Sequence, residues 1–306
     1  MHTISEILRA AAQLEPHGVA VAAAHDEAVI EAVAAARRQG IARAVLVGDG
    51  EQIRTLLTAA GENSSDYDII EAADDADCAA RAVAAVREGR ADFLMKGLLG
   101  TATLMRAVLD REKGLRTGRL ISHVMLYEPA GYKMMALTDG GMNTFPDLEK
   151  KAGILENAAL VLRALGYGTI HAACVCGAEV VDPRIPSMVD AQALAAMTER
   201  WEKYGMNVYG PVGLDLAVSK EACAHKHYAA PGCGEADILL VPSYEVGNGI
   251  GKAMSLFGGA RSAGIIMGAK VPIILVSRSD SAGTKLASLA LGAVVAAHSE
   301  KEETVC

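Results

Sequence analysis

VPIILVSRSDSAGTKLASLALGAVV, residues 271–295, changes character twice along its length. Its apolar, β-branched run Ile273–Val276 follows a proline and is typical of a buried strand in a parallel sheet. Residues 277–281 are polar, and residues 285–295 are again apolar and rich in small residues, as in a helix packed on a sheet. A strand, a polar turn and a helix in this order predict an α/β fold.

The polar turn of this stretch is a candidate anion site. A helix N-terminus presents unpaired N–H groups and the positive end of the helix dipole, here beside Arg278. The alternative is that Ser279, Asp280 or Ser281 only caps the helix and that Arg278 is a solvated surface charge. The turn by itself leaves both interpretations open.

The composition limits the class of protein. A chain of 306 residues is long enough for two domains or one large α/β unit. Hydrophobic residues make up 51% of the chain and aromatic residues only 4%, which fits alternating helices and strands better than a β-sandwich. The formal net charge of −8 argues against a nucleic-acid or anionic-membrane surface, so we expect neither partner.

The N-terminal residues, the length of the apolar stretches and the cysteine spacing together predict a cytoplasmic protein. Residues 1–15 are charged and amphipathic rather than typical of a signal peptide. The longest uncharged apolar stretch, residues 286–297, is too short to span a bilayer. The six cysteines form no C-x-x-C pair and no disulfide framework, so we expect reduced thiols.

The N-terminal part alternates between strand-like and helix-like segments. We expect strands at residues 19–24, 44–47, 69–70 and 92–95, with helices at residues 26–38, 51–60 and 75–88. This alternation predicts a parallel, doubly wound sheet.

The pattern changes after residue 128. Strand-like residues 121–126 and 132–138 flank a short turn, which predicts an antiparallel hairpin. A long helix (148–165), a buried strand (170–175), further helices near 191–203 and 219–225, and a strand (237–241) follow. We therefore expect domain I to comprise residues 1–128 and 268–306, and domain II to comprise residues 129–267.

Polar residues follow the predicted strand at residues 92–95. Lys96 and Gly97 come directly after it, and Thr103 and Arg106 occupy the next turn and helix. Ligands of open α/β sheets bind beyond the carboxyl ends of strands, so Lys96 and Arg106 are placed to face an anion. The alternative is that both are ordinary surface charges.

Two more segments hold candidate binding residues. Asp139 and Asn143, in TDGGMN, follow a strand, although both residue types are common turn formers. Asn248 and Lys252 lie in GNGIGK, which lacks the first glycine and the Ser/Thr of a P-loop. Close backbone approach to a phosphate, with Lys252 as a point charge, is one interpretation of this glycine-rich segment.

We expect no metal site. His225 and His227 lie on different faces of a helix at this spacing, and no carboxylate cluster accompanies them. Asp215 is either a helix cap or a site residue, and the sequence does not decide between the two.

Several blocks, taken in order, resemble the phosphate acetyltransferase and phosphate butyryltransferase family, nearer to its butyryl-type branch. They are LMKGLLGTATLMRAVL (94–109), SHV (122–124), LTDGGMNTFPDLEKK (137–151), GAEVVDPRIPSMVDA (177–191), YGPVGLDLAVS (209–219), ADILLVPSYEVGNGIGK (236–252) and AGIIMGAKVPIILVSRSD (263–280). Any single block is a weak signal, whereas this many in the same order is a strong one.

The resemblance implies an α/β fold with a two-domain isocitrate/isopropylmalate dehydrogenase-like architecture, parallel and mixed sheets and an interdomain cleft. It implies reversible transfer of a short acyl group between CoA and inorganic phosphate, butyryl-type in preference to acetyl. Acyl-CoA and phosphate are then the substrates, with no permanently bound cofactor, and the second domain forms a homodimer contact.

The resemblance also assigns residues. In that family the Ser–Arg pair matching Ser277 and Arg278 lies at the phosphate site, and the residues matching Thr103 and Arg106 help to line the cleft. The catalytic candidates are Arg278 and Ser277, with Asp280 added although it does not match the family pattern. Besides Thr103 and Arg106, the substrate-binding candidates include residues chosen from their places in the chain: Lys96, Gly97, Asp139, Asn143, Asn248 and Lys252.

One position departs from the family pattern. Relatives proposed to use a carboxylate base carry an aspartate six residues after the arginine, where this chain has Thr284. Asp280 either takes over as the base or serves only as a cap. A thiol with a pKa of about 8.5 is only a few per cent thiolate at pH 7, a deficit of roughly 2 kcal/mol. Holding the reactants in attack geometry supplies on the order of 7–11 kcal/mol, so the departure does not exclude activity.

Other functions remain compatible with this architecture. A metal-dependent decarboxylating dehydrogenase needs an aspartate cluster and a nicotinamide loop, and the sequence contains neither. A non-catalytic acyl-CoA-binding relative would keep the binding residues without turnover. Transfer from acyl carrier protein would need a basic docking patch, which this acidic chain does not offer. Phosphate acetyltransferase is the alternative within the family itself.

Overall fold

The structure is a computed structural model that describes residues 1–277 and 280–305, and of residues 300–305 only the backbone. The chain forms two compact units. We call residues 4–119 and 262–306 the terminal unit, and residues 1–3 and 120–261 the central unit. Compactness does not test whether each part folds alone, so the expected domain limits stay a prediction.

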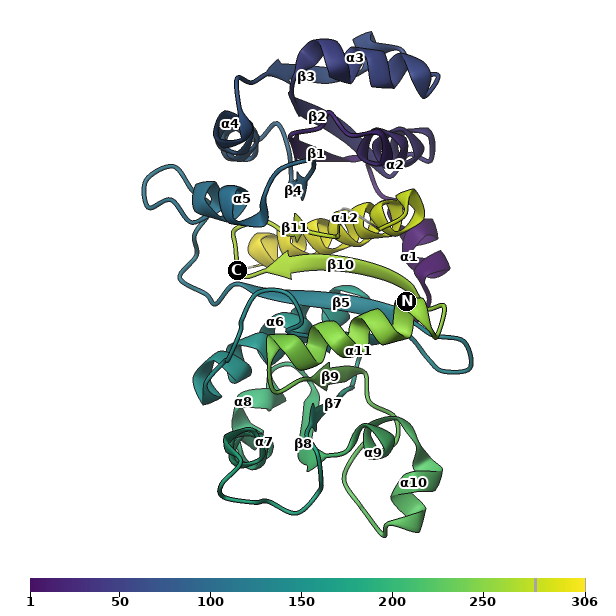
Figure 1. The fold of residues 1–306 in the computed structure, drawn as a ribbon, viewed down its shortest axis with the longest axis vertical. Coiled ribbons are helices and arrows are strands. Elements are labelled where there is room, and N and C mark those ends of the chain that lie inside the picture. Colours follow the sequence, from purple (N-terminus) through teal and green to yellow (C-terminus); the bar gives the residue numbers. More distant parts are fainter. Residues whose placement is uncertain (278–279, 306) are drawn as a thin grey trace. The chain divides into compact units, whose positions relative to one another are not determined.

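The terminal unit is a sheet of mostly parallel strands with helices on both faces (Figure 1). Its elements are α1 (Ile4–Ala11), β1 (His17–Ala22), α2 (Glu27–Arg38), β2 (Ala42–Gly48), α3 (Gly50–Ala59), η1 (Ser64–Asp66), β3 (Asp68–Glu71), α4 (Asp75–Arg87), β4 (Phe93–Lys96), α5 (Thr101–Val108), β10 (Arg261–Met267), β11 (Ile273–Ile274) and α12 (Ala282–Val305). The strand order is β3-β2-β1-β4-β11-β10, with only β10 antiparallel to its neighbour β11. The expected parallel, doubly wound sheet is confirmed.

Aspartate side chains cap α2, α3 and α4. The side chains of Asp26, Asp49 and Asp74 each accept a hydrogen bond from a backbone N–H of the first helical turn, at 2.9–3.0 Å. Helices α2 and α12 pack together, while α4 packs against β1 and β2 from the other side of the sheet (Figure 1). Because β1, β4 and β11 are parallel, their carboxyl ends lie on the same side of the sheet.

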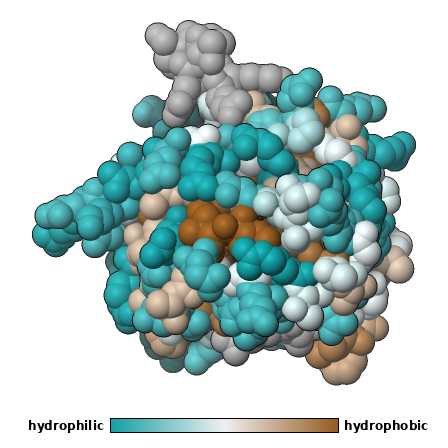
Figure 2. All heavy atoms as spheres, turned by 90° about the horizontal axis from the view of Figure 1, so that it is seen from above, coloured by the Kyte–Doolittle hydropathy of each residue, from teal (hydrophilic) through white to brown (hydrophobic). Residues whose placement is uncertain are grey.

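The free edge of this sheet is short and charged. Figure 2 shows one small hydrophobic area within a hydrophilic surface at the end of the molecule where β3 and α3 lie. The edge strand β3 leaves Ile69 and Ile70 half-buried, while Asp68 pairs with Arg90 and Glu71 accepts a hydrogen bond from Gly50 N. Charged strand ends of this kind discourage pairing with another chain.

The central unit is a mixed sheet with the strand order β5-β6-β9-β7-β8. Its elements are β5 (Ser122–Glu128), β6 (Met135–Thr138), α6 (Leu148–Ala164), β7 (Ile170–Val175), α7 (Pro186–Ala196), α8 (Thr198–Glu202), β8 (Met206–Val212), α9 (Leu214–Val218), α10 (Lys220–His225), β9 (Ile238–Leu240) and α11 (Tyr244–Leu256). Strands β5 and β6 are antiparallel, which confirms the predicted hairpin, and the other pairs are parallel. Helix α6 packs against β5, β6, β7 and β9, and α11 packs against β6.

Sequence patterns miss three elements of the central unit, namely β8, the short helix α9 and α11. Strand β8 contains Gly210 and Pro211, and α11 contains three glycines, all of which weaken the usual strand and helix signals. Within the part of the chain that the structure describes, no helix has both the length and the apolar character needed to cross a bilayer.

Candidate active site

In the terminal unit, two of the predicted site segments follow β4 and β11, which are neighbouring parallel strands. Lys96 is the last residue of β4, and β11 runs parallel to β4 with Ile274 beside Met95. Strands β4 and β11 therefore have neighbouring carboxyl ends, with Lys96 at the end of β4 and Ser277 after β11 in the sequence. Arg278 itself lies outside the described residues.

Lys96 is not an ordinary surface charge. It is only 7% exposed, and its Nζ donates hydrogen bonds to the backbone oxygens of Gly97 at 3.1 Å and Leu99 at 3.3 Å. A buried ammonium group needs such partners because desolvation is costly. Lys96 therefore places a positive charge at the carboxyl end of β4 and shapes the loop that follows.

Gly97 is required by close backbone approach. Its N–H donates to Ala22 O at 2.8 Å, and a Cβ at this position would overlap with Ala23 O and lie 2.7 Å from Ala22 O. Only glycine lets the loop after β4 pack this closely against the loop after β1. The two loops therefore pack closely together at the carboxyl ends of β1 and β4.

Thr103 and Arg106 both lie on α5, one turn apart. Thr103 is half-buried in the first turn, and Arg106 is exposed. Residues three apart share one face of a helix, so the two side chains lie on the same side of α5. The structure therefore keeps them together, as expected.

Asp280 closes the turn after β11. Its Oδ2 accepts a hydrogen bond from Ser277 N at 2.8 Å, and its own N–H donates to Ser277 O at 3.1 Å. The cap of α12 is Ser281, whose Oγ accepts from Thr284 N at 3.2 Å. Among the described residues none donates a hydrogen bond to Asp280 Oδ1.

Lys285 is a buried residue that is not among the predicted site residues, and it contacts Asp280. Lys285 is 3% exposed, and its Nζ donates a hydrogen bond to Asp280 O. It brings a positive charge next to the backbone of Asp280. The signal in the sequence is a single lysine at the start of an otherwise apolar helical stretch.

In the central unit Asp139 organises the turn after β6. Its carboxylate is 2% exposed and accepts hydrogen bonds from Gly141 N and Met142 N at 2.8 Å, and from His123 N at 3.1 Å. Asn143 Nδ2 donates to the same carboxylate at 2.7 Å. Four donors occupy the acceptor positions of a carboxylate, so Asp139 is a buried turn-forming residue.

The glycine-rich segment GNGIGK is not a loop, and the interpretation of its backbone as a phosphate cradle is wrong. It lies inside α11, where Gly247 N already donates to Ser243 O at 3.1 Å. The glycines serve packing: a Cβ at Gly247 would lie 2.8 Å from Gly140 Cα, and one at Gly251 would overlap with Tyr127 Oη. Asn248 and Lys252 are exposed on one face of α11.

The cysteines at the carboxyl end of β7 are poor nucleophiles. Burial raises the pKa of Cys174 and of Cys176, which keeps both thiols protonated near neutral pH. Over the described ranges no group of three His, Cys, Asp or Glu side chains has metal-site geometry. Asp215 pairs with Lys226, which lowers the pKa of that carboxyl.

A model of one protein family covers most of this chain. The family, described as phosphate acetyl/butaryl transferase, matches residues 64–293. The chain belongs to this family. The phosphate butyryltransferase of Clostridium beijerinckii is 41% identical over 296 residues, which cover 96% of this chain and 98% of that protein. The phosphate acetyltransferase of Thermotoga maritima is 39% identical over 279 residues, with 91% and 95% covered. The chain is accordingly a transferase, as its sequence blocks imply.

Solved structures agree with this membership. A branched-chain phosphotransacylase from Enterococcus faecalis V583 is 33% identical, with a TM-score of 0.81 and coverage of 92% of this chain and 99% of that chain. A 4-hydroxythreonine-4-phosphate dehydrogenase from Burkholderia phymatum is 14% identical with a TM-score of 0.56, covering 92% and 98%, and shows a likeness of fold alone. The expected α/β, dehydrogenase-like architecture is confirmed.

Proposed function

We propose that this chain catalyses the reversible transfer of a short acyl group between CoA and inorganic phosphate, with butyryl-type chains preferred over acetyl. The observation that carries the proposal is the 41% identity to a phosphate butyryltransferase over 98% of that protein's length. Similarity at 39% to a phosphate acetyltransferase makes acetyl transfer the alternative within the same chemistry.

The reaction makes definite demands on the protein. A phosphate oxygen forms a bond to the thioester carbonyl carbon, the C–S bond breaks, and the leaving thiolate takes up a proton to give CoA. In the reverse reaction the thiol loses its proton and its sulfur bonds to the acyl carbon of the acyl phosphate, while the C–O bond to phosphate breaks and inorganic phosphate leaves. Both directions need cations for phosphate, donors for the carbonyl oxygen, and a group that exchanges the thiol proton.

In this proposal the residues of the terminal unit bind phosphate. The guanidinium of Arg278 binds two phosphate oxygens, and Ser277 hydrogen-bonds the phosphate or the carbonyl oxygen. The buried ammonium group of Lys96 adds positive charge, the Gly97 loop holds its position, and Thr103 and Arg106 contribute from α5. The parallel pairing of β4 and β11 supports these roles, because it makes the carboxyl ends of the two strands neighbours.

Asp280 is our proposed acceptor of the thiol proton. Its Oδ2 is bound to Ser277 N, whereas its Oδ1 has no donor within the described ranges. One oxygen can therefore fix the side chain while the other exchanges a proton.

Replacing Asp280 by asparagine should lower the rate of CoA acylation by acyl phosphate about tenfold at pH 7, with the difference narrowing toward pH 9. Asparagine keeps an acceptor for Ser277 N but cannot take a proton, so only CoA that is already thiolate reacts. The measurement is kcat/KM against pH.

The matched control for this variant is Asp110→Asn. Asp110 is an exposed turn residue of the same unit, and hydrogen bonds from Lys113 N and Glu112 N hold the pKa of that carboxyl below its usual range. Its loss should leave the pH profile unchanged. A wild-type profile for Asp280→Asn would reduce Asp280 to a turn-forming residue.

In the central unit we propose that Asn143, Asn248 and Lys252 contact substrate. Asn248 and Lys252 are exposed on α11, whose glycines pack it against the turn held by Asp139. Asp139 contributes to binding through that turn.

Thiol release from a series of acyl-CoAs, with and without phosphate, tests the proposed function directly. Butyryl-CoA should give phosphate-dependent release with a higher kcat/KM than acetyl-CoA, because the relatives that match over their full length include butyryl-transferring enzymes. Higher kcat/KM with acetyl-CoA would move the chain to the acetyl alternative. CoA binding without phosphate-dependent release would leave only a non-catalytic binding protein.

We also propose a homodimer in the cytoplasm that works without a resident cofactor or metal. The exposed Leu256 (74%) and Phe257 (90%) at the end of α11 support an apolar contact between copies. Free thiols at Cys78, Cys174 and Cys223 fit a reducing compartment.

A further inference from the structure

The amide of Asn143 is held in one orientation. Its Nδ2 donates to Ile121 O at 2.9 Å and to Asp139 Oδ2 at 2.7 Å. A backbone carbonyl and a carboxylate both require a donor, so the nitrogen must lie on this side and both of its hydrogens are used. The oxygen Oδ1 of Asn143 therefore has to face the other way.

That oxygen is an open hydrogen-bond acceptor. No residue in the described part of the chain donates to Asn143 Oδ1, and the atom is not buried. It lies in the turn after β6, where the carboxyl ends of β6 and β9 are neighbours. Parallel strands of open α/β sheets place ligands beyond such ends.

The chemistry of this acceptor selects between the two substrates. Asn143 has no hydrogen left to offer, and its carbonyl oxygen repels the charged oxygens of phosphate and of acyl phosphate. The pantetheine arm of CoA, by contrast, carries amide N–H donors next to the thioester. An oriented amide oxygen suits such a donor, which would otherwise lose its hydrogen bond to water on binding.

Resting on the proposed function, we infer that Asn143 Oδ1 accepts a hydrogen bond from a pantetheine amide of acyl-CoA. Asp139 is the positioning residue that sets this acceptor. All four hydrogen bonds of the Asp139 carboxylate are internal, from His123 N, Gly141 N, Met142 N and Asn143 Nδ2. It acts on the substrate only through Asn143.

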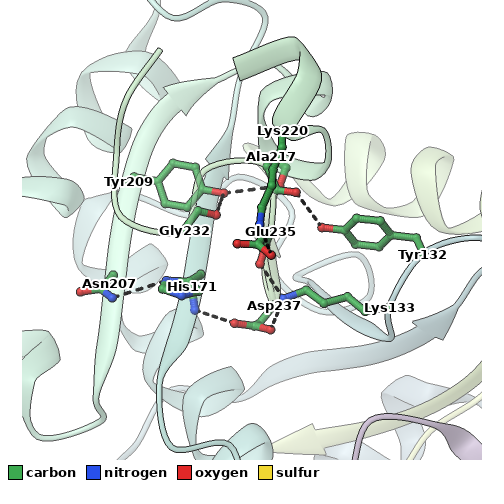
Figure 3. A network of polar contacts seen from close by, with 11 residues as sticks. Tyr132, Lys133, His171, Asn207, Tyr209, Ala217, Lys220, Gly232, Glu235 and Asp237 are labelled. Atoms are coloured by element: carbon green, nitrogen blue, oxygen red, sulfur yellow. Dashed lines mark hydrogen bonds and ion pairs between the residues drawn. The ribbon is translucent and has the colours of Figure 1, made fainter. Parts of the chain in front are cut away.

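The experiment uses the full chain and measures KM for butyryl-CoA and for phosphate, together with the melting temperature. The variants are Asn143→Ala, which removes the acceptor, and Asp139→Asn, which puts an N–H group against another donor in either amide orientation. Asp237→Asn is the matched control. Asp237 is also a buried carboxylate of the central unit, but it accepts from His171 N at 2.8 Å and Lys133 Nζ at 2.6 Å, at the amino ends of β7 and β9 (Figure 3).

We expect Asn143→Ala to raise KM for butyryl-CoA about fivefold, the effect of one lost hydrogen bond, with KM for phosphate unchanged. Asp139→Asn should shift the same KM in the same direction and also lower the melting temperature. Asp237→Asn should lower only the melting temperature. A higher KM for butyryl-CoA in Asp139→Asn but not in Asp237→Asn distinguishes a positioning role of Asp139 from a purely structural one.

Two results would overturn the inference while leaving the proposed function intact. One is an Asn143→Ala enzyme whose KM for butyryl-CoA stays within twofold of wild type, and the other is an increase in KM for phosphate alone. If Asp139→Asn does not fold, Asn143→Ala decides the question. A wild-type protein without phosphate-dependent thiol release would instead overturn the proposed function, and this inference with it.

Discussion

Replacing Arg278 by alanine should lower kcat/KM for acyl transfer by about 10²–10³-fold, and replacing it by lysine should still cost tenfold or more. In the proposed function Arg278 holds phosphate as the transition state forms, and alanine would remove that charge, a loss comparable to that of a main oxyanion donor. Lysine keeps the charge but loses the planar fork that binds two phosphate oxygens at once.

Steady-state kinetics with butyryl-CoA and phosphate test this prediction. Arg111→Lys, an exposed arginine of the same unit, is the matched control and should behave as wild type. The ammonium groups of Lys96 and Lys285 remain in every variant, so a loss is attributable to Arg278 itself. Wild-type kinetics for Arg278→Lys would remove Arg278 from the phosphate site.

Replacing Gly97 by alanine should lower the melting temperature by about 10 °C and the activity more than 100-fold. The new Cβ would overlap with Ala23 O and lie 2.7 Å from Ala22 O, and backbone atoms cannot move aside as a flexible side chain can. A clash of this kind costs about 4 kcal/mol or more, and about 2–4 °C is lost per kcal/mol in a unit of this size. The displaced loop also shifts the carbonyl oxygens of Gly97 and Leu99, which accept hydrogen bonds from Lys96 Nζ.

Thermal unfolding and activity of Gly97→Ala are best compared with those of Gly249→Ala. Gly249 is exposed within α11, and a Cβ there meets nothing within 4 Å. Alanine is the better helix former by about 1 kcal/mol, so this control should be slightly stabilised. A Gly97→Ala protein with wild-type melting temperature and activity would contradict the close packing of the loops after β1 and β4.

Much of the local structure is predictable because its causes are local. The caps at Asp26, Asp49 and Asp74 precede their helices directly, and the hairpin of β5 and β6 follows from two strand-like segments and a short turn. The blocks that resemble the phosphate acetyltransferase and butyryltransferase family also predict the family correctly.

The glycine-rich part of α11 shows where local reasoning fails. Three glycines within six residues weaken any helix signal and favour the interpretation of a phosphate loop. The helix forms because Gly247 and Gly251 let it pack against Gly140 and Tyr127, which lie far away in the chain. Packing against distant residues outweighs local propensity at this position.

The amino-acid sequence by itself determines the strand–turn–helix alternation, the family and the residue types of the site, because periodicity, caps and motifs are properties of neighbouring residues. Tertiary structure alone decides which polar atoms stay available. Asp139 uses all its acceptors on its own turn and on His123, whereas Asn143 and Asp280 each have one oxygen that accepts no hydrogen bond from the described residues. The physical reason is that hydrogen bonds between distant segments depend on strand register and burial, which no local pattern specifies.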